Sequence, residues 1–241
     1  MTATPEATIR EIVGTDYRTA AVFQRFGLDF CCGGCRTIGE ACRDARVDET
    51  AVLRELDTVL RTQPAGVPRY DTWDARRLIA HIVDVHHDYV RRALPVLIQH
   101  TSKIAEVHAA RHPELPHVAD LFRRVAAEMT EHMAKEEQVL FPFVAALEDA
   151  RTSGAPAPVP PFGRVGSPIA VMEAEHRFVG DAMAEMRHLT GDFVPPEDAC
   201  ATYRVCLEEL DAFERDLHDH VHLENNILFP KAIALESGSR S

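Results

Sequence analysis

Two segments of the chain carry a histidine and a glutamate four residues apart, each followed by Leu-Phe-Pro. The first pair is His132 with Glu136, in HMAKEEQVLFP, and the second is His220 with Glu224, in HVHLENNILFP. Residues four apart lie on one face of an α-helix, one turn along. Each pair can therefore reach one point, and imidazole with carboxylate is a typical ligand combination for iron or manganese.

Two single histidines repeat with nearly the same spacing. His87 opens the sequence HDYV, and His176 opens HRFV in the second half. Each half is thus a helix with one histidine, followed by a helix with the His-x-x-x-Glu motif, which indicates an internal repeat. The repeat predicts six metal ligands: His87, His132, Glu136, His176, His220 and Glu224.

The helix faces that carry these ligands are otherwise largely apolar. In the first motif helix, the expected inward face consists of Leu121, Val125, Glu128, His132, Glu136, Val139 and Phe143. Buried carboxylates without partners are costly, and metal coordination removes that cost. Two divalent ions with a bridging oxide or hydroxide would balance four neutral imidazoles and two carboxylates. We expect two iron ions, each bound by two histidines and bridged by the glutamates, although manganese accepts the same ligands.

Neighbouring residues are alternatives at two ligand positions. Glu137 could replace the glutamate before it, but the second copy has Asn225 at that place. His86 could replace the histidine after it, but the other half has Glu175 there. Glu175 lies directly before a predicted ligand histidine, and Glu128 and Asp216 each lie one turn before one. We expect these three carboxylates either to support the ligands or to face solvent.

The segment FGLDFCCGGC places Cys31 and Cys32 directly before two glycines. If a helix begins near Cys35, its N-terminus lowers the pKa of nearby thiols. We expect a functional thiol role for Cys31 and Cys32, either redox chemistry or transient metal binding. Because Cys35 completes a C-x-x-C pattern and Cys42 follows, a cluster bound by these four cysteines is a further alternative.

Helical periodicity and helix-breaking residues divide the chain into three parts. Residues 1–62 are predicted to form a small domain of short helices, residues 63–73 a linker, and residues 74–236 a four-helix bundle. The bundle helices are expected at about 74–108, 115–150, 168–189 and 197–235. With a connection between each successive pair, they suit an up-down-up-down bundle, and the predicted fold class is all-α.

The composition narrows the classes of function. The formal charge of −12 argues against nucleic acid as a partner, because phosphate binding needs a basic surface. No apolar run approaches the length of a membrane span, and the first residues lack the apolar core of a secretory signal. We therefore expect a cytoplasmic protein whose thiols stay reduced, with no membrane partner.

The motifs resemble those of a known family. VMEAEH, HMAKEEQVLFP and LENNILFP resemble the hemerythrin-like (HHE) domain, and residues 16–40, with DFCCGG, resemble the ScdA-type N-terminal domain. Together they look like the iron–sulfur cluster repair di-iron proteins, the Ric family. The resemblance implies the same six ligands and assigns the thiol pair of the family to Cys31 and Cys32. Cys35 and Cys42 depart from the family pattern.

The resemblance also implies a function in the response to oxidative and nitrosative stress. The di-iron centre would donate iron to damaged iron–sulfur proteins or to a cluster assembly scaffold, or it would reduce nitric oxide, and the residues alone do not choose between these roles. An enzyme activity is thus left open. The alternative function is a hemerythrin-like sensor or binding protein for O2, NO or redox state. The sequence does not predict an oligomeric state.

Overall fold

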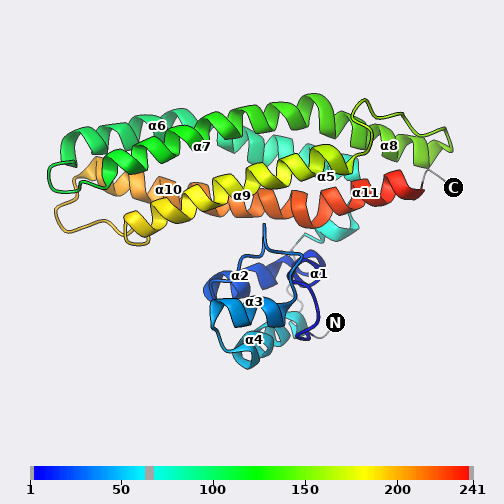
Figure 1. Ribbon diagram of the computed structural model, residues 1–241, viewed down its shortest axis with the longest axis horizontal. Coiled ribbons are helices and arrows are strands. Elements are labelled where there is room, and N and C mark those ends of the chain that lie inside the picture. Colours follow the sequence, from blue (N-terminus) through cyan, green and yellow to red (C-terminus); the bar gives the residue numbers. More distant parts are fainter. Residues whose placement is uncertain (1–2, 63–67, 239–241) are drawn as a thin grey trace. The chain divides into compact units, whose positions relative to one another are not determined.

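The computed structural model describes residues 3–62 and 68–238 of the chain (Figure 1). The regular elements in these ranges are all helices, and one isolated β-bridge joins Thr8 to Thr37. The predicted all-α fold class is therefore confirmed. Of the predicted linker, residues 63–67 lie outside the described residues, and residues 68–73 include a short 3₁₀ helix, η2 (Tyr70–Thr72).

The chain divides into two compact units. One consists of Met1–Leu78 together with Val221–Ser241, and the other of Ile79–His220. The boundaries between these units fall within helices, whereas the domain boundaries expected from the sequence fall at a linker. The expected domain boundaries therefore stay a prediction.

The unit Ile79–His220 is built from long helices. It contains the end of α5 (Ala75–His81), then η3 (Ile82–His87), α6 (Asp88–His108), α7 (Leu115–Lys135), η4 (Glu136–Leu140), α8 (Phe141–Ser153), α9 (Gly166–Leu189) and most of α10 (Ala201–His222). The elements η3 and η4 are π-helical turns that continue the neighbouring α-helices without a break. Helix α6 also continues through Pro95.

Four of these helices form a closed bundle. Figure 1 shows α6, α7, α9 and α10 running alongside one another, and α7 packs against both α6 and α9. Arg187 of α9 closes the third side through hydrogen bonds to Asp211 and Glu214 of α10, with Nη2 2.7 Å from Asp211 Oδ1. On the fourth side, His100 Nδ1 of α6 lies 2.6 Å from a Glu209 oxygen of α10. Each helix can therefore turn one face to a common interior.

The interior of the bundle is filled mainly by apolar side chains. On α9 the buried residues are Ile169, Met172, His176, Val179 and Met183, among others. Phe122 of α7 and Phe213 of α10 are both fully buried, and their rings meet edge to face with centroids 5.5 Å apart. Burial of such side chains stabilises the bundle by about 1.5–3 kcal/mol each.

The other unit begins with short helices: α1 (Ile9–Thr15), the 3₁₀ turn η1 (Tyr17–Thr19), α2 (Ala20–Arg25), α3 (Ile38–Ala45) and α4 (Glu49–Arg61). Helices α1 and α3 each begin with a capping box. The hydroxyls of Thr8 and Thr37 each accept a hydrogen bond from the backbone N–H of the glutamate three residues later, and the side chain of that glutamate accepts one from the backbone N–H of the threonine. Gly27 follows α2 with a φ of 66°, as expected for a glycine after a helix.

The last part of the chain belongs to the same unit. It consists of η5 (Leu223–Leu228), a third π-helical turn, and α11 (Phe229–Gly238). Helix α1 packs against η5, and Lys231 Nζ of α11 donates a hydrogen bond of 2.7 Å to the Trp73 carbonyl. The segment formed by η5 and α11 therefore contacts both α1 and Trp73.

Candidate metal centre

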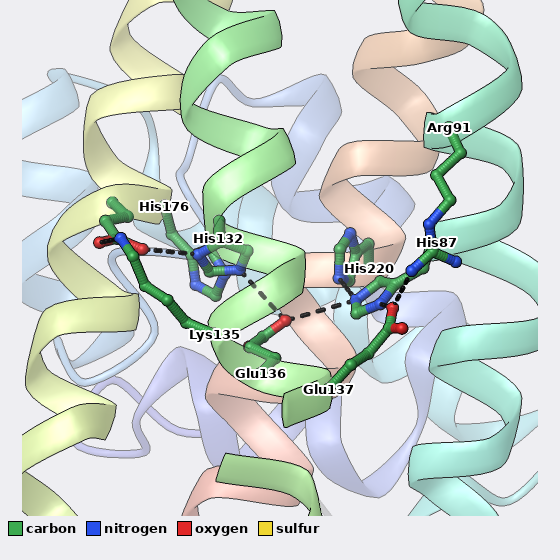
Figure 2. Close-up of polar contacts among 9 residues, drawn as sticks. His87, Arg91, His132, Lys135, Glu136, Glu137, His176 and His220 are labelled. Carbon is green, nitrogen blue, oxygen red and sulfur yellow. Dashed lines mark hydrogen bonds and ion pairs between the residues drawn. The ribbon is translucent and has the colours of Figure 1, made fainter. Parts of the chain in front are cut away.

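Five of the six predicted ligands lie within the unit Ile79–His220, and all five are at most 1% exposed. His87 ends η3, His132 lies near the end of α7, Glu136 begins η4, His176 lies in α9, and His220 lies in α10. Figure 2 shows their side chains converging from the four sides of the bundle, with Glu136 between the histidines. The repeat thus brings together residues up to 133 positions apart in the chain.

The histidines form two pairs that share one carboxylate. Nε2 of His87 lies 3.1 Å from Nε2 of His220, and Nε2 of His176 lies 3.0 Å from Nε2 of His132. Glu136 Oε2 lies 3.3 Å from His87 Nε2 and 3.3 Å from His132 Nε2. One oxygen therefore lies between the two histidine pairs, as expected for a carboxylate that can bridge two ions.

This arrangement fits metal ions better than hydrogen bonds. Both Glu136 oxygens are buried, and neither accepts a hydrogen bond from any residue that the structure describes. An ionised carboxylate in that state is strongly destabilised unless a cation binds it. Two nitrogens that bind one ion at about 2.1 Å and at right angles are about 3.0 Å apart. Both Nε2–Nε2 distances are close to that value.

Glu224, the sixth predicted ligand, is fully buried in η5. It follows His220 by four residues along the continuous helix formed by α10 and η5. Four residues make about one helical turn, which rises about 5.4 Å. This spacing is the reason for the prediction that His220 and Glu224 can reach one common point.

Three of the four helical segments that carry a predicted ligand contain a π-helical turn at such a ligand. His87 ends η3, Glu136 begins η4, and Glu224 lies in η5. A π-turn adds one residue to the helix and rotates the residues after it, and such turns are frequent at functional sites. The expectation that Val139 faces inward was therefore wrong: Val139 is 47% exposed, and Leu140, one residue later, is buried instead.

Carboxylates hold the outer nitrogens of two histidines. His132 Nδ1 lies 2.9 Å from Glu175 Oε2, and His87 Nδ1 lies 2.6 Å from Glu137 Oε1. Lys135 donates a hydrogen bond to Glu175. Arg91 donates one to Glu137, as Figure 2 shows. Such partners fix the ring orientation and keep the proton on Nδ1, so that Nε2 can bind a metal.

These two carboxylates are ionised. Burial raises the pKa of Glu137, but the hydrogen bonds from His87 and Arg91 outweigh it and leave the pKa below its ordinary value. Glu175 has the same balance, with His132 and Lys135 as the donors that lower its pKa. Each histidine thus donates its Nδ1 proton to a carboxylate that is itself fixed by a cation.

The other two carboxylates that were expected to support the ligands, Asp216 and Glu128, form no hydrogen bond to a predicted ligand histidine among the described residues. Asp216 Oδ1 hydrogen-bonds to Nδ1 of His86 at 2.9 Å, and the His86 ring stacks on the His220 ring with centroids 5.7 Å apart. Glu128 is half-buried one turn before His132, and among the described residues it has no hydrogen bond to a histidine. Sequence reasoning overlooked the support by Glu137, although its place beside a ligand was a signal for it.

The cysteine segment differs from its expectation. Helix α3 begins at Ile38, so the condition for a lowered thiol pKa, a helix that begins near Cys35, is not met. Instead, the hydrogen bond to Cys32 and burial raise the pKa of the Cys31 thiol well above its ordinary value. Cys31 is buried and Cys32 half-buried, with their Sγ atoms 4.0 Å apart. The group that they form with Asp29 does not include Cys35 or Cys42.

Comparison with known protein families defines the class of the protein. The hemerythrin HHE cation binding domain matches residues 78–232, and the ScdA_N domain, a domain of unknown function (DUF542), matches residues 5–60. The chain therefore belongs to the hemerythrin HHE family, with an ScdA-type N-terminal domain. Its buried histidine and glutamate groups fit iron binding.

Individual relatives cover nearly the whole chain. The chain is 36% identical over 217 residues to the "Iron-sulfur cluster repair protein YtfE" of Yersinia pestis (strain Pestoides F), an alignment that covers 90% of this chain and 91% of the relative. The protein of the same name from Yersinia pseudotuberculosis serotype O:1b (strain IP 31758) matches to the same extent. The family resemblance expected from the sequence is confirmed. No helix in the described ranges is long and apolar enough to cross a membrane.

Proposed function

We propose that this chain is a di-iron protein that repairs damaged iron–sulfur clusters by donating iron. The observation that supports the proposal most strongly is the single Glu136 oxygen 3.3 Å from a nitrogen of each histidine pair. A carboxylate in that position serves two ions at once. The name of the Yersinia relatives supplies the cellular role, cluster repair.

The ligands in this proposal are the six that the repeat predicts. His87 and His220 would hold one iron, His132 and His176 would hold the other, and Glu136 would be the ligand shared by both. Glu224 is assigned as the second bridge because it is fully buried and repeats the spacing of Glu136 from its motif histidine.

The charge and the number of the ligands affect how such a centre would hold iron. Iron bound by these residues would supply redox chemistry and a releasable ferrous ion. Four neutral imidazoles and two carboxylates contribute a charge of only −2, which leaves a di-ferrous centre with a net charge of +2. Two histidines and two carboxylates per ion are fewer ligands than the six of an octahedral site. This open ligand set favours access of small molecules and release of the metal.

Release of iron can be tested directly. The wild-type protein would be loaded with isotopically labelled ferrous iron and mixed with a cluster protein that has lost one iron by oxidation. Appearance of the label in the client's cluster, with recovery of its activity in the presence of a chelator of free iron, supports donation. Label that stays with the donor, or that reaches the client only without the chelator, argues against it.

Reduction of nitric oxide is the second candidate role of the same centre. The buried, carboxylate-bridged pair of sites favours it, because two adjacent ions can bind two small molecules side by side. Nitric oxide would be added anaerobically to the di-ferrous protein and nitrous oxide measured. Stoichiometric nitrous oxide supports turnover, whereas a stable nitrosyl spectrum without nitrous oxide favours the alternative, a sensor or binding protein.

A further inference from the structure

A second group of potential metal ligands lies in the loop of residues 29–34, here called the thiol loop. Asp29, Cys31 and Cys32 each place one ligand atom within 4.8 Å of the others. Cys31 Sγ is 3.3 Å from Asp29 Oδ1 and 4.0 Å from Cys32 Sγ. Two sulfurs bound to one ion at about 2.3 Å with tetrahedral angles would be about 3.8 Å apart. The observed spacing is therefore close to that of a chelating pair.

The thiol loop holds these groups together before any ion binds. Asp29 Oδ1 accepts backbone N–H groups from Cys31, at 3.0 Å, and from Cys32, at 2.9 Å. The two glycines are sterically required: a Cβ on Gly33 would lie 2.8 Å from the Asp29 carbonyl oxygen, and one on Gly34 would lie 2.5 Å from Asn226 Oδ1. Glycine at position 33 thus allows the tight turn, and glycine at position 34 allows the Asn226 side chain to approach the loop.

Two buried asparagines of η5 fix the thiol loop from outside. Asn225 Nδ2 donates to the Cys31 carbonyl at 3.1 Å, and Asn226 Nδ2 donates to the Phe30 carbonyl at 2.9 Å. Asn225 is only 3% exposed and Asn226 only 7%. These buried amides hold the backbone of the thiol loop in one conformation. The thiol groups are therefore not needed to hold the loop in place.

The geometry also disfavours a disulfide within the pair. Adjacent Cα atoms are about 3.8 Å apart across a trans peptide, whereas a disulfide usually needs about 4.4–6.8 Å. The chain has no cis peptide bond among its described residues. Of the two thiol roles expected from the sequence, metal binding therefore fits this loop better than an internal dithiol–disulfide couple.

We propose that Asp29, Cys31 and Cys32 form an exchangeable site for one divalent transition-metal ion of the ferrous or zinc type. The inference rests on the proposed function, because a protein that donates iron benefits from a second site through which iron passes. On binding, both thiols release their protons to solvent and two metal–sulfur bonds form, with no change in oxidation state. Thiolate with carboxylate suits Fe²⁺ or Zn²⁺ rather than Mg²⁺ or Ca²⁺.

The site is built for exchange rather than for permanent binding. It offers three ligands, whereas closed structural zinc sites have four. Asp29 is exposed and Cys32 half-buried, so that a water or a ligand from another molecule can take the remaining position. An incoming ligand can then displace the ion without unfolding the loop.

The test uses cobalt(II) as the probe, added anaerobically to the full-length protein whose histidine centre is already loaded with iron. Thiolate–cobalt bonds give a near-ultraviolet charge-transfer band, which histidine and carboxylate ligands do not. The expected result is a band that saturates at one cobalt per chain and disappears on addition of zinc. Cys31→Ser with Cys32→Ser should abolish the band, and the matched control Cys35→Ser should keep it.

A second variant protects the test against misfolding. Asp29→Asn keeps an oxygen that can accept the two backbone N–H groups but removes the charge, so the titration midpoint should move to higher cobalt concentration. A saturating band that persists in the double serine variant, or the absence of any band in the wild type, would overturn the inference. Iron content is measured in the same samples: two irons without a band reject only the thiol site, and a band without iron rejects only the histidine centre.

Discussion

The two His-x-x-x-Glu motifs repeat in sequence, yet the residues after each glutamate perform different tasks. In the first copy, Glu137 accepts a hydrogen bond from His87 of the histidine centre. In the second copy, the equivalent residue is Asn225, which donates to the backbone of Cys31 in the thiol loop. The two copies thus share the predicted metal ligands, while the adjacent residues make different contacts in each copy.

The two copies also differ in how deeply the π-turns are covered. Val139 in η4 is 47% exposed, whereas its counterpart in η5, Ile227, is 7% exposed. The turn η5 packs against α1, and the residues from Val221 onward belong to the same unit as the N-terminal helices. Variants at equivalent positions should therefore behave differently.

The largest effect is expected for Glu136→Ala. This change removes the oxygen that lies between the histidine pairs, so the loss of metal should exceed the roughly 10–100-fold that follows removal of an outer partner. Iron per chain, measured after gel filtration, should fall to a small fraction of the wild-type value. Glu131→Ala, on the exposed side of α7, is the control and should keep its iron; equal losses in both would show that Glu136 is not a ligand.

A smaller effect is expected at the core position of the second π-turn. Ile227→Ala should lower the free energy of unfolding by about 2–5 kcal/mol, because it leaves a cavity. The equivalent change in the first copy, Val139→Ala, should alter it by no more than about 0.5 kcal/mol. Urea unfolding of the two variants measures the difference, and similar destabilisation of both would contradict the different burial of the two turns.

Removal of one outer carboxylate should weaken the histidine centre without destroying it. Glu137→Gln keeps the shape of the side chain but not its charge, and it should raise the rate of iron loss to a chelator by about 10–100-fold. Glu175→Gln should act similarly through His132. Glu128→Gln is the comparison variant, and a loss as large as that of Glu137→Gln would show that the hydrogen bond to His87 is not what matters.

The smallest effect is expected for Asn225→Ala. It removes the donor to the Cys31 carbonyl and should cost about 1–3 kcal/mol of stability. Iron content should stay near the wild-type value, while thiol alkylation of Cys32 should become faster as the thiol loop loosens. Unchanged alkylation would show that Asn225 does not hold the loop.

Much of the candidate site could be predicted from the sequence because it depends on helical spacing. The positions of His132 and Glu136 follow from the four-residue period, and the repeat distinguished Glu136 from Glu137. The fold class followed from periodicity and breakers in the same way. Periodicity cannot predict a change of period, and for that reason the π-turn after Glu136 made the expectation for Val139 wrong.

The remaining features depend on contacts between distant segments. Whether Glu175 or Glu128 reaches a histidine depends on how α7 and α9 pack, and only the first one does among the described residues. The role of Asn226 depends on a loop almost 200 residues earlier in the chain. A lowered pKa of Cys31 depended on a helix that begins near Cys35. Helix α3 begins at Ile38 instead, and the hydrogen bond to Cys32, together with burial, raises that pKa.

The proposed di-iron centre is tested most directly by the iron content of the purified, anaerobically reconstituted protein, combined with Mössbauer spectroscopy of the oxidised form. A di-iron centre on these ligands should give two irons per chain that are magnetically coupled through shared ligands, and both should be lost in Glu136→Ala. One uncoupled iron, or no stoichiometric metal in a folded protein, would contradict a di-iron centre built on these histidines.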